Sequence, residues 1–69
     1  MAIFKISIKP DDYHKLEEVV TAMKEVVIMK AVEYPDDIDA FTIVFLRMEN
    51  PVDLSYILLM VGGQQLRHP

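Results

Sequence analysis

The sequence predicts an α+β domain with elements in the order βαββα, built as a three-stranded antiparallel sheet with two helices on one face. Three observations predict it. Residues 2–9 alternate between apolar and polar, residues 11–24 and 51–61 carry apolar side chains at helical spacing, and residues 26–34 and 40–48 are rich in β-branched and aromatic side chains. A period of two is typical of a strand, and a period near 3.6 is typical of a helix.

The first strand is expected at residues 2–9 (AIFKISIK), because every second residue is apolar. One face of this strand carries Ala2, Phe4, Ile6 and Ile8, and the other carries Ile3, Lys5, Ser7 and Lys9. The strand is therefore predicted to be half-buried, with its first set of side chains directed at the core.

A proline and two aspartates separate this strand from the first helix. Pro10 has no N–H group for the sheet, and Asp11 and Asp12 can accept the free N–H groups at a helix N-terminus. The apolar residues that follow have helical spacing: Tyr13, Leu16, Val19, Val20 and Met23. We predict an amphipathic helix over residues 11–24.

The segment after this helix has two interpretations. Residues 26–29 (VVIM) are mostly β-branched, and β-branched side chains favour a strand, so the second strand is predicted over residues 26–34. The alternative extends the helix to about Lys30, since Val26, Val27 and Lys30 keep the helical spacing and no Gly, Pro or Asn precedes them.

The remainder of the chain has clear boundaries. Residues 34–39 (YPDDID) form a turn, and residues 40–48 form a third strand that makes a hairpin with the second. Asn50 before Pro51 is a typical helix start, and the helix runs to Val61, where Gly62 follows.

This order of elements resembles the ferredoxin-like βαββαβ arrangement without its fourth strand. Residues 64–69 (QQLRHP) are short and polar and end in proline, so they are predicted as a polar tail after a single domain at residues 1–63. In the full arrangement the fourth strand lies beside the first. Here the first strand is expected to have an open edge.

Both faces of the predicted sheet are apolar. In the third strand Phe41, Ile43 and Phe45 lie on one side, whereas Val44, Leu46 and Met48 lie on the other. If the helices cover the second set, the core side also takes Val27, Met29 and Ala31 of the second strand. The opposite side keeps the following apolar or aromatic side chains: Ile3, Val26, Ile28, Val32, Tyr34, Phe41, Ile43 and Phe45.

An uncovered apolar face predicts a partner, most simply a second copy of the chain. A domain of 69 residues is marginally stable by itself, and the absence of cysteine removes disulfides as a source of stability. We therefore expect a homodimer formed through the sheet face or the open edge of the first strand, with another protein as a further candidate partner. The expected interface residues are Ile3, Lys5, Ile28, Val32, Tyr34, Phe41, Ile43, Phe45 and Arg47.

No catalytic, cofactor-binding or metal-binding residue is assigned from the sequence. His14 is interpreted as a helix histidine among charges, the aspartates of residues 36–39 as turn formers, and Ser7 and Ser55 have no nucleophile motif around them. The sequence thus favours a non-catalytic interaction or regulatory protein. One alternative is a small-molecule-binding or enzymatic ferredoxin-like dimer, with His14 or Tyr56 inside a deep cavity.

A second alternative is single-stranded nucleic-acid binding on the sheet face, where Lys5, Lys30 and Arg47 would lie beside aromatic side chains. The net charge of −4 disfavours it, because the overall field repels phosphate, and disfavours anionic membranes equally. No segment has the roughly 18–20 apolar residues of a membrane span. The N-terminus lacks the features of a secretory signal, so a cytoplasmic location is expected.

Overall fold

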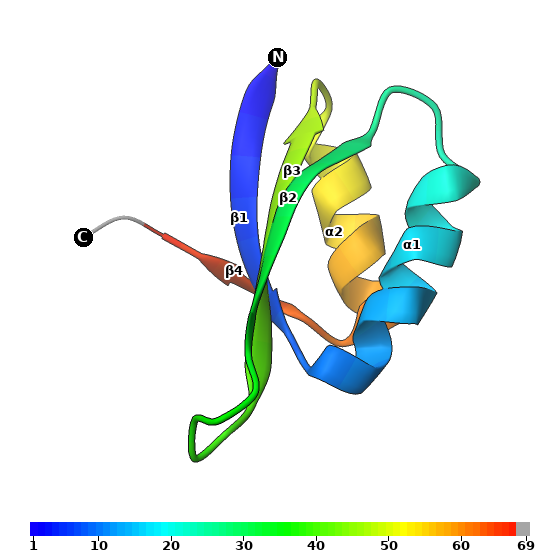
Figure 1. Cartoon of the computed structure of the whole chain (residues 1–69). Coiled ribbons are helices and arrows are strands. Elements are labelled where there is room, and N and C mark those ends of the chain that lie inside the picture. The colour runs from blue at the N-terminus through cyan, green and yellow to red at the C-terminus, as the bar shows by residue number, and fades with distance from the viewer. Residues whose placement is uncertain (68–69) are drawn as a thin grey trace.

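The computed structural model describes residues 1–67 and shows an antiparallel sheet with two helices packed on one side of it (Figure 1). The predicted α+β class is confirmed. The elements in chain order are β1 (Ala2–Ile8), the short 3-10 helix η1 (Pro10–Asp12), α1 (Tyr13–Thr21), β2 (Val27–Tyr34), β3 (Phe41–Met48), α2 (Pro51–Val61) and β4 (Gln64–Leu66).

The sheet has four strands in the order β2-β3-β1-β4, so the prediction of three strands is wrong. Residues 64–66, expected in a polar tail, form β4 and pair antiparallel with β1, Leu66 opposite Lys5 and Gln64 opposite Ser7. Strand pairing uses backbone groups, so the free edge of β1 can recruit a polar segment of three residues. The last two residues of the expected tail, His68 and Pro69, lie outside the described residues.

Two glycines bring β4 back to the sheet. Gly62 ends α2 in the left-handed region, with φ 72°, and its N–H donates to the carbonyl oxygen of Leu58 at 2.9 Å. A Cβ atom on Gly63 would lie 2.6 Å from Cγ2 of Ile8 and 3.0 Å from the carbonyl oxygen of Ser7. The glycine pair is therefore more than a helix stop, because Gly63 permits the close approach of the chain to β1.

The strand interpretation of residues 26–34 is confirmed. The helix α1 ends at Thr21 and β2 begins at Val27. Between them Glu25 has φ 63°, a left-handed conformation that a helix cannot contain. The predicted start of the second helix is also confirmed, since Oδ1 of Asn50 accepts the N–H of Val52 at 3.0 Å.

The register of β2 changes at a bulge between Ile28 and Lys30. Before the bulge Ile28 pairs with Leu46, and after it Lys30 pairs with Phe45, so Met29 is the extra residue. One extra residue reverses which side chains of a strand face the core. Ile28 therefore lies on the helix side and packs against the core, while Val27 lies on the other side, the reverse of the prediction.

Three further side chains in or next to β2 are buried or exposed contrary to the prediction. Met29, expected in the core, is about half exposed, and Val26, expected on the opposite side of the sheet, is buried. Beyond the bulge the pairing returns to the predicted alternation, with Ala31 opposite Val44 and Val32 opposite Ile43, but Ala31, expected in the core, is exposed. A single inserted residue thus affects only the first part of β2.

The core lies between the sheet and the two helices. Its buried apolar members are Ile6, Ile8, Leu16, Val20, Val26, Val44, Leu46, Met48, Leu54, Ile57 and Val61. Alternate residues of β3 are buried and half-buried, which shows that the helices seal one face of the sheet only. The alternation of apolar side chains in the sequence predicted the buried positions in β3 and in the second half of β1.

The bulge makes a testable distinction between two neighbouring residues. Ile28→Ala should lower the free energy of unfolding by about 2 kcal/mol, because it removes core contacts. Val27→Ala should lower it by less than about 1 kcal/mol, because that side chain faces away from the core. Urea denaturation at low protein concentration measures both; equal losses, or a larger loss for Val27→Ala, would contradict the register.

Candidate interaction surface

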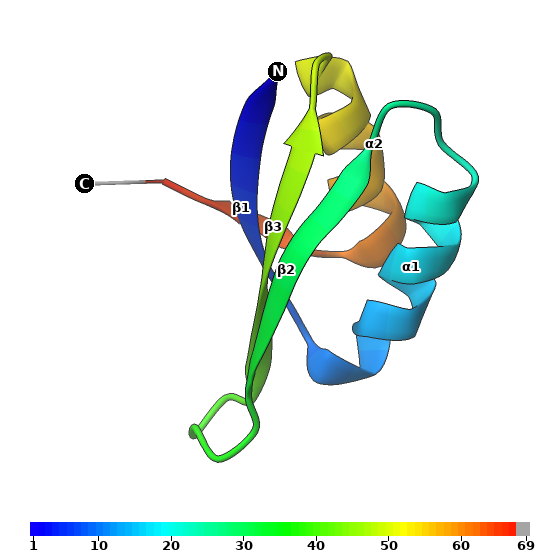
Figure 2. The ribbon, with the colours of Figure 1, turned by 45° about the horizontal axis from the view of Figure 1, so that its top comes forward.

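The side of the sheet that faces away from the helices is bare in the monomer (Figure 2). We call it the open face and define it by the strand pairing. Its residues are Ile3, Lys5, Ser7, Val27, Lys30, Val32, Tyr34, Phe41, Ile43, Phe45, Arg47, Gln64 and Leu66. Eight of these side chains are apolar or aromatic and none is acidic. The solvated face of an antiparallel sheet is ordinarily polar.

One end of the open face is aromatic. Tyr34 and Phe41 are cross-strand neighbours at the end of the β2–β3 hairpin, and their rings stack with centroids 4.8 Å apart and planes 15° apart. The next pair along the two strands is Val32 with Ile43. These side chains form a continuous apolar strip over the centre of the sheet.

The other end of the open face is cationic. Phe45 pairs with Lys5 on one side and with Lys30 on the other, and Arg47 follows two residues later on β3. We call these three basic residues the cationic end. Within residues 1–67 the only contact between a basic and an acidic side chain is that of His14 with Glu18 on α1, so no acidic side chain forms an ion pair with the cationic end.

The side chain of Arg47 lies between those of Ile3 and Val27, its neighbours across β1 and β2. Its Nε atom is buried and has no hydrogen-bond partner within the described chain. A buried N–H group without an acceptor costs about 1–3 kcal/mol. The monomer therefore holds an arginine with one buried N–H group that lacks an acceptor.

The hairpin between β2 and β3 has the opposite charge. Its tip, residues 36–39, contains three aspartates around Ile38, whose side chain is 98% exposed. The hairpin extends beyond the helices and its tip bends toward the side of the sheet that the helices leave bare (Figures 1 and 2). We call this segment the hairpin tip. It places acidic groups and one apolar side chain at the aromatic end of the open face.

A second exposed apolar surface lies on α2. Along its outward side Val52, Tyr56, Leu59 and Met60 are exposed, and Leu59 is 81% exposed. Residues three or four apart share one side of a helix, so these side chains form one stripe. The stripe has no basic residue, unlike the open face.

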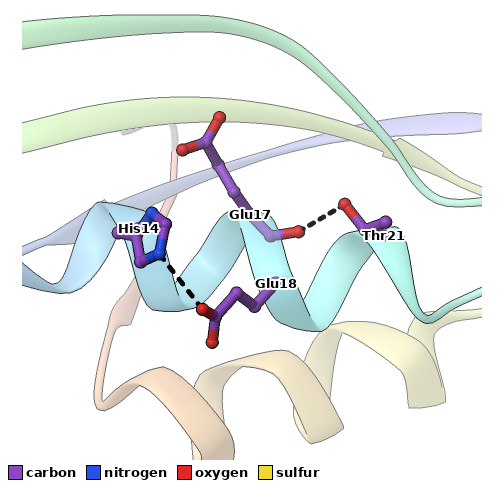
Figure 3. A network of polar contacts seen from close by, with 4 residues as sticks. All are labelled: His14, Glu17, Glu18 and Thr21. Atoms are coloured by element: carbon purple, nitrogen blue, oxygen red, sulfur yellow. Dashed lines mark hydrogen bonds and ion pairs between the residues drawn. The ribbon is translucent and has the colours of Figure 1, made fainter.

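His14 lies on the exposed surface of α1, away from the open face. Its Nε2 is 3.1 Å from Oε1 of Glu18, and one turn later the hydroxyl of Thr21 donates to the carbonyl oxygen of Glu17 at 2.7 Å (Figure 3). In the neighbouring Tyr13, burial and, to a smaller extent, the charge of Glu17 raise the pKa of the phenol. His14 thus takes part in a local helix contact on the surface.

Neither polar group of the enzymatic alternative lies in a deep cavity, since the side chain of His14 is 82% exposed and Tyr56 is also exposed. Over residues 1–67 no three His, Cys, Asp or Glu side chains come together in a group able to hold a metal ion. The sequence alternative that depends on an enclosed polar group gains no support from these positions.

The structure brings together all but one of the residues expected at the interface. Ile28 is the exception, because the bulge turns it toward the core. Sequence reasoning missed Val27 for the same reason, and it missed Leu66 because three polar-flanked residues carry no recognisable strand signal. It also missed Ile38, although an isoleucine between aspartates in a turn is itself an unusual signal.

Comparison with protein-family models, curated proteins and solved structures found no match. In the described part of the chain, neither helix has the length and apolar character needed to cross a membrane. The assignment of a function therefore depends on the surfaces themselves.

The unused hydrogen-bonding group of Arg47 leads to a prediction about stability. Arg47→Met keeps the apolar stem and removes the buried N–H, so the monomer should keep its free energy of unfolding within about 1 kcal/mol or become more stable. Chemical denaturation under dilute conditions measures this. A loss of more than about 2 kcal/mol would show that the arginine stabilises the monomer through a contact not seen here.

Proposed function

We propose that this chain is a non-catalytic interaction or regulatory protein that self-associates through the open face. The observation that carries the proposal is the set of eight apolar and aromatic side chains on a sheet face that no helix covers. The βαββαβ order, with β4 beside β1, resembles the ferredoxin-like arrangement, which leaves one sheet face free in the same way.

The free energy gained by burying apolar side chains supports an open face that is covered by a second copy. Full burial of one large apolar side chain contributes roughly 1.5–3 kcal/mol. Most open-face side chains are already half-buried by their neighbours, so each has only part of that contribution left. Summed over two identical faces, the remainder is still comparable with the stability of a small domain, which is about 5–15 kcal/mol.

The strand edges support association less well than the face does. On the outer side of β1, β4 covers Lys5, Ile6 and Ser7. The sheet then ends in β4, which has three residues, and in β2, which contains the bulge. Short edge strands and bulged edge strands are poor templates for pairing with another chain. We therefore favour face-to-face packing over edge pairing.

The size of the open face fits a dimer interface. A stable interface buries about 800 Å² on each partner. The described chain has an accessible surface of 4956 Å², so such a patch would be roughly a sixth of it. One face of a domain made of two layers supplies an area of this order.

Sedimentation equilibrium tests the proposal. The wild-type protein should be a dimer that dissociates on dilution, and Ile43→Asp at the centre of the open face should raise the dissociation constant by at least about a hundredfold, since the change occurs twice in a symmetric dimer. The matched control is Leu59→Asp on the stripe of α2, which should leave the dissociation constant unchanged. A folded wild-type monomer at all concentrations would refute self-association.

A second candidate rests on one specific observation, the row Lys30–Phe45–Lys5 across three strands. An aromatic ring flanked by cations suits a stacked base and its phosphates. Fluorescence anisotropy with oligouridylate and oligothymidylate at low and physiological salt separates the two functions. Self-association predicts no binding at physiological salt. Salt-dependent binding that Lys30→Glu abolishes and that dissociates the dimer would identify nucleic acid as the occupant instead.

A further inference from the structure

We propose that two copies pack open face against open face with their strands reversed, so that the hairpin tip of each copy covers the cationic end of the other. This inference rests on the proposed self-association and specifies its geometry. The argument uses the charge at the two ends of the open face, the spacing of residues along β3 and the bend of the hairpin tip.

Charge selects between the two symmetric ways of stacking identical faces. In a two-fold face-to-face dimer the axis lies between the sheets, either along the strands or across them. An axis along β3 places each level of the sheet against itself, so Arg47 would meet the partner's Arg47 and Lys5 would meet the partner's Lys30. An axis across the strands reverses one copy and brings opposite ends together, which avoids this repulsion.

The spacing along β3 places the axis at Ile43. Phe41 and Phe45 lie two residues on either side of it, and Asp39 and Arg47 lie four residues on either side. At about 3.4 Å per residue, Arg47 lies roughly 14 Å from Ile43 along β3, and Asp39 lies in the turn just before the other end of the strand. An axis at Ile43 therefore places the acidic hairpin tip of one copy at the level of the partner's Arg47.

The same axis brings compatible groups of β2 and β3 together at the intermediate level. Reversal about an axis across the strands keeps β2 opposite the partner's β2 and β3 opposite the partner's β3. Lys30 then faces the partner's Tyr34, and Phe45 faces the partner's Phe41. An ammonium group over an aromatic ring and a pair of offset aromatic rings are both favourable contacts.

The hairpin tip has the shape and the chemistry for a contact with the partner's cationic end. Its bend toward the open side directs it at the partner's sheet, which lies about 10 Å away when two sheets pack face to face. Asp39 would then offer a carboxylate to the exposed part of the partner's Arg47 guanidinium, because that side chain is only half-buried and has no ion pair within the described chain. The fully exposed Ile38 would gain cover in the same contact.

Charge reversal with mixing tests this geometry. Arg47→Glu and Asp39→Arg should each raise the dissociation constant of the homodimer by about tenfold or more, because each places two like-charged pairs in the interface. An equimolar mixture of the two variants should form a heterodimer close to wild-type affinity, since both of its contacts again join opposite charges. Native mass spectrometry distinguishes the heterodimer from the two homodimers when one variant is isotopically labelled.

The controls keep protein folding separate from association. Lys24→Glu and Glu17→Arg make the same changes of charge at exposed positions in and just after α1, and neither they nor their mixture should alter the dissociation constant. Circular dichroism and thermal unfolding establish that each variant is folded. Asp39→Asn, a smaller change in an exposed turn, should weaken the dimer in the same direction.

The outcomes distinguish the inference from the function on which it rests. A wild-type monomer at every concentration refutes self-association itself. A wild-type dimer that neither charge reversal weakens, or that mixing does not restore, overturns the reversed geometry and leaves self-association in place. A dimer of the Arg47→Met variant that is tighter than the wild-type dimer would favour stacking about the other axis, because that change removes the repulsion between the two arginines there.

Discussion

The rest of the structure depends on one constraint: the sheet has two apolar faces and the chain has enough helix to cover only one. The helices bury the inward side chains of β1 and β3, including Ile6, Val44 and Leu46, without any access to solvent. The outward side chains of β3 alternate with them and are just as apolar, yet only neighbouring strands shield them. The surface that the fold leaves uncovered is therefore also the surface on which a function is most simply placed.

Small departures from regular structure decide the composition of that surface. The bulge at Met29 removes Ile28 from the open face and adds Val27. The strand β4 adds Leu66, and it also covers part of the edge of β1 that would otherwise compete as an interface. Both features change which side chains a partner would meet, while neither changes the class of the fold.

The net charge of −4 conceals a separation of charge that matters more than its total. The cationic end of the open face forms no ion pair among the residues that the structure describes, whereas the hairpin tip carries three aspartates in four residues. The negative net charge of the whole chain argues against a polyanionic partner. The arrangement in space instead favours a partner that is acidic where this face is basic, and a reversed copy of the chain meets that description.

The sequence by itself determined three strands and two helices, the core positions of β1 and β3 and the apolar character of the second sheet face, because these follow from local periodicity and from helix signals such as Asn50 before Pro51. Only the tertiary structure decided the register of β2, the fourth strand and the bend of the hairpin tip. A bulge has no signature in the apolar pattern of VVIM, since every residue there suits either face. The pairing of Gln64, Gln65 and Leu66 depends on an edge that exists only once β1 and β3 have met, with Gly63 allowing the approach.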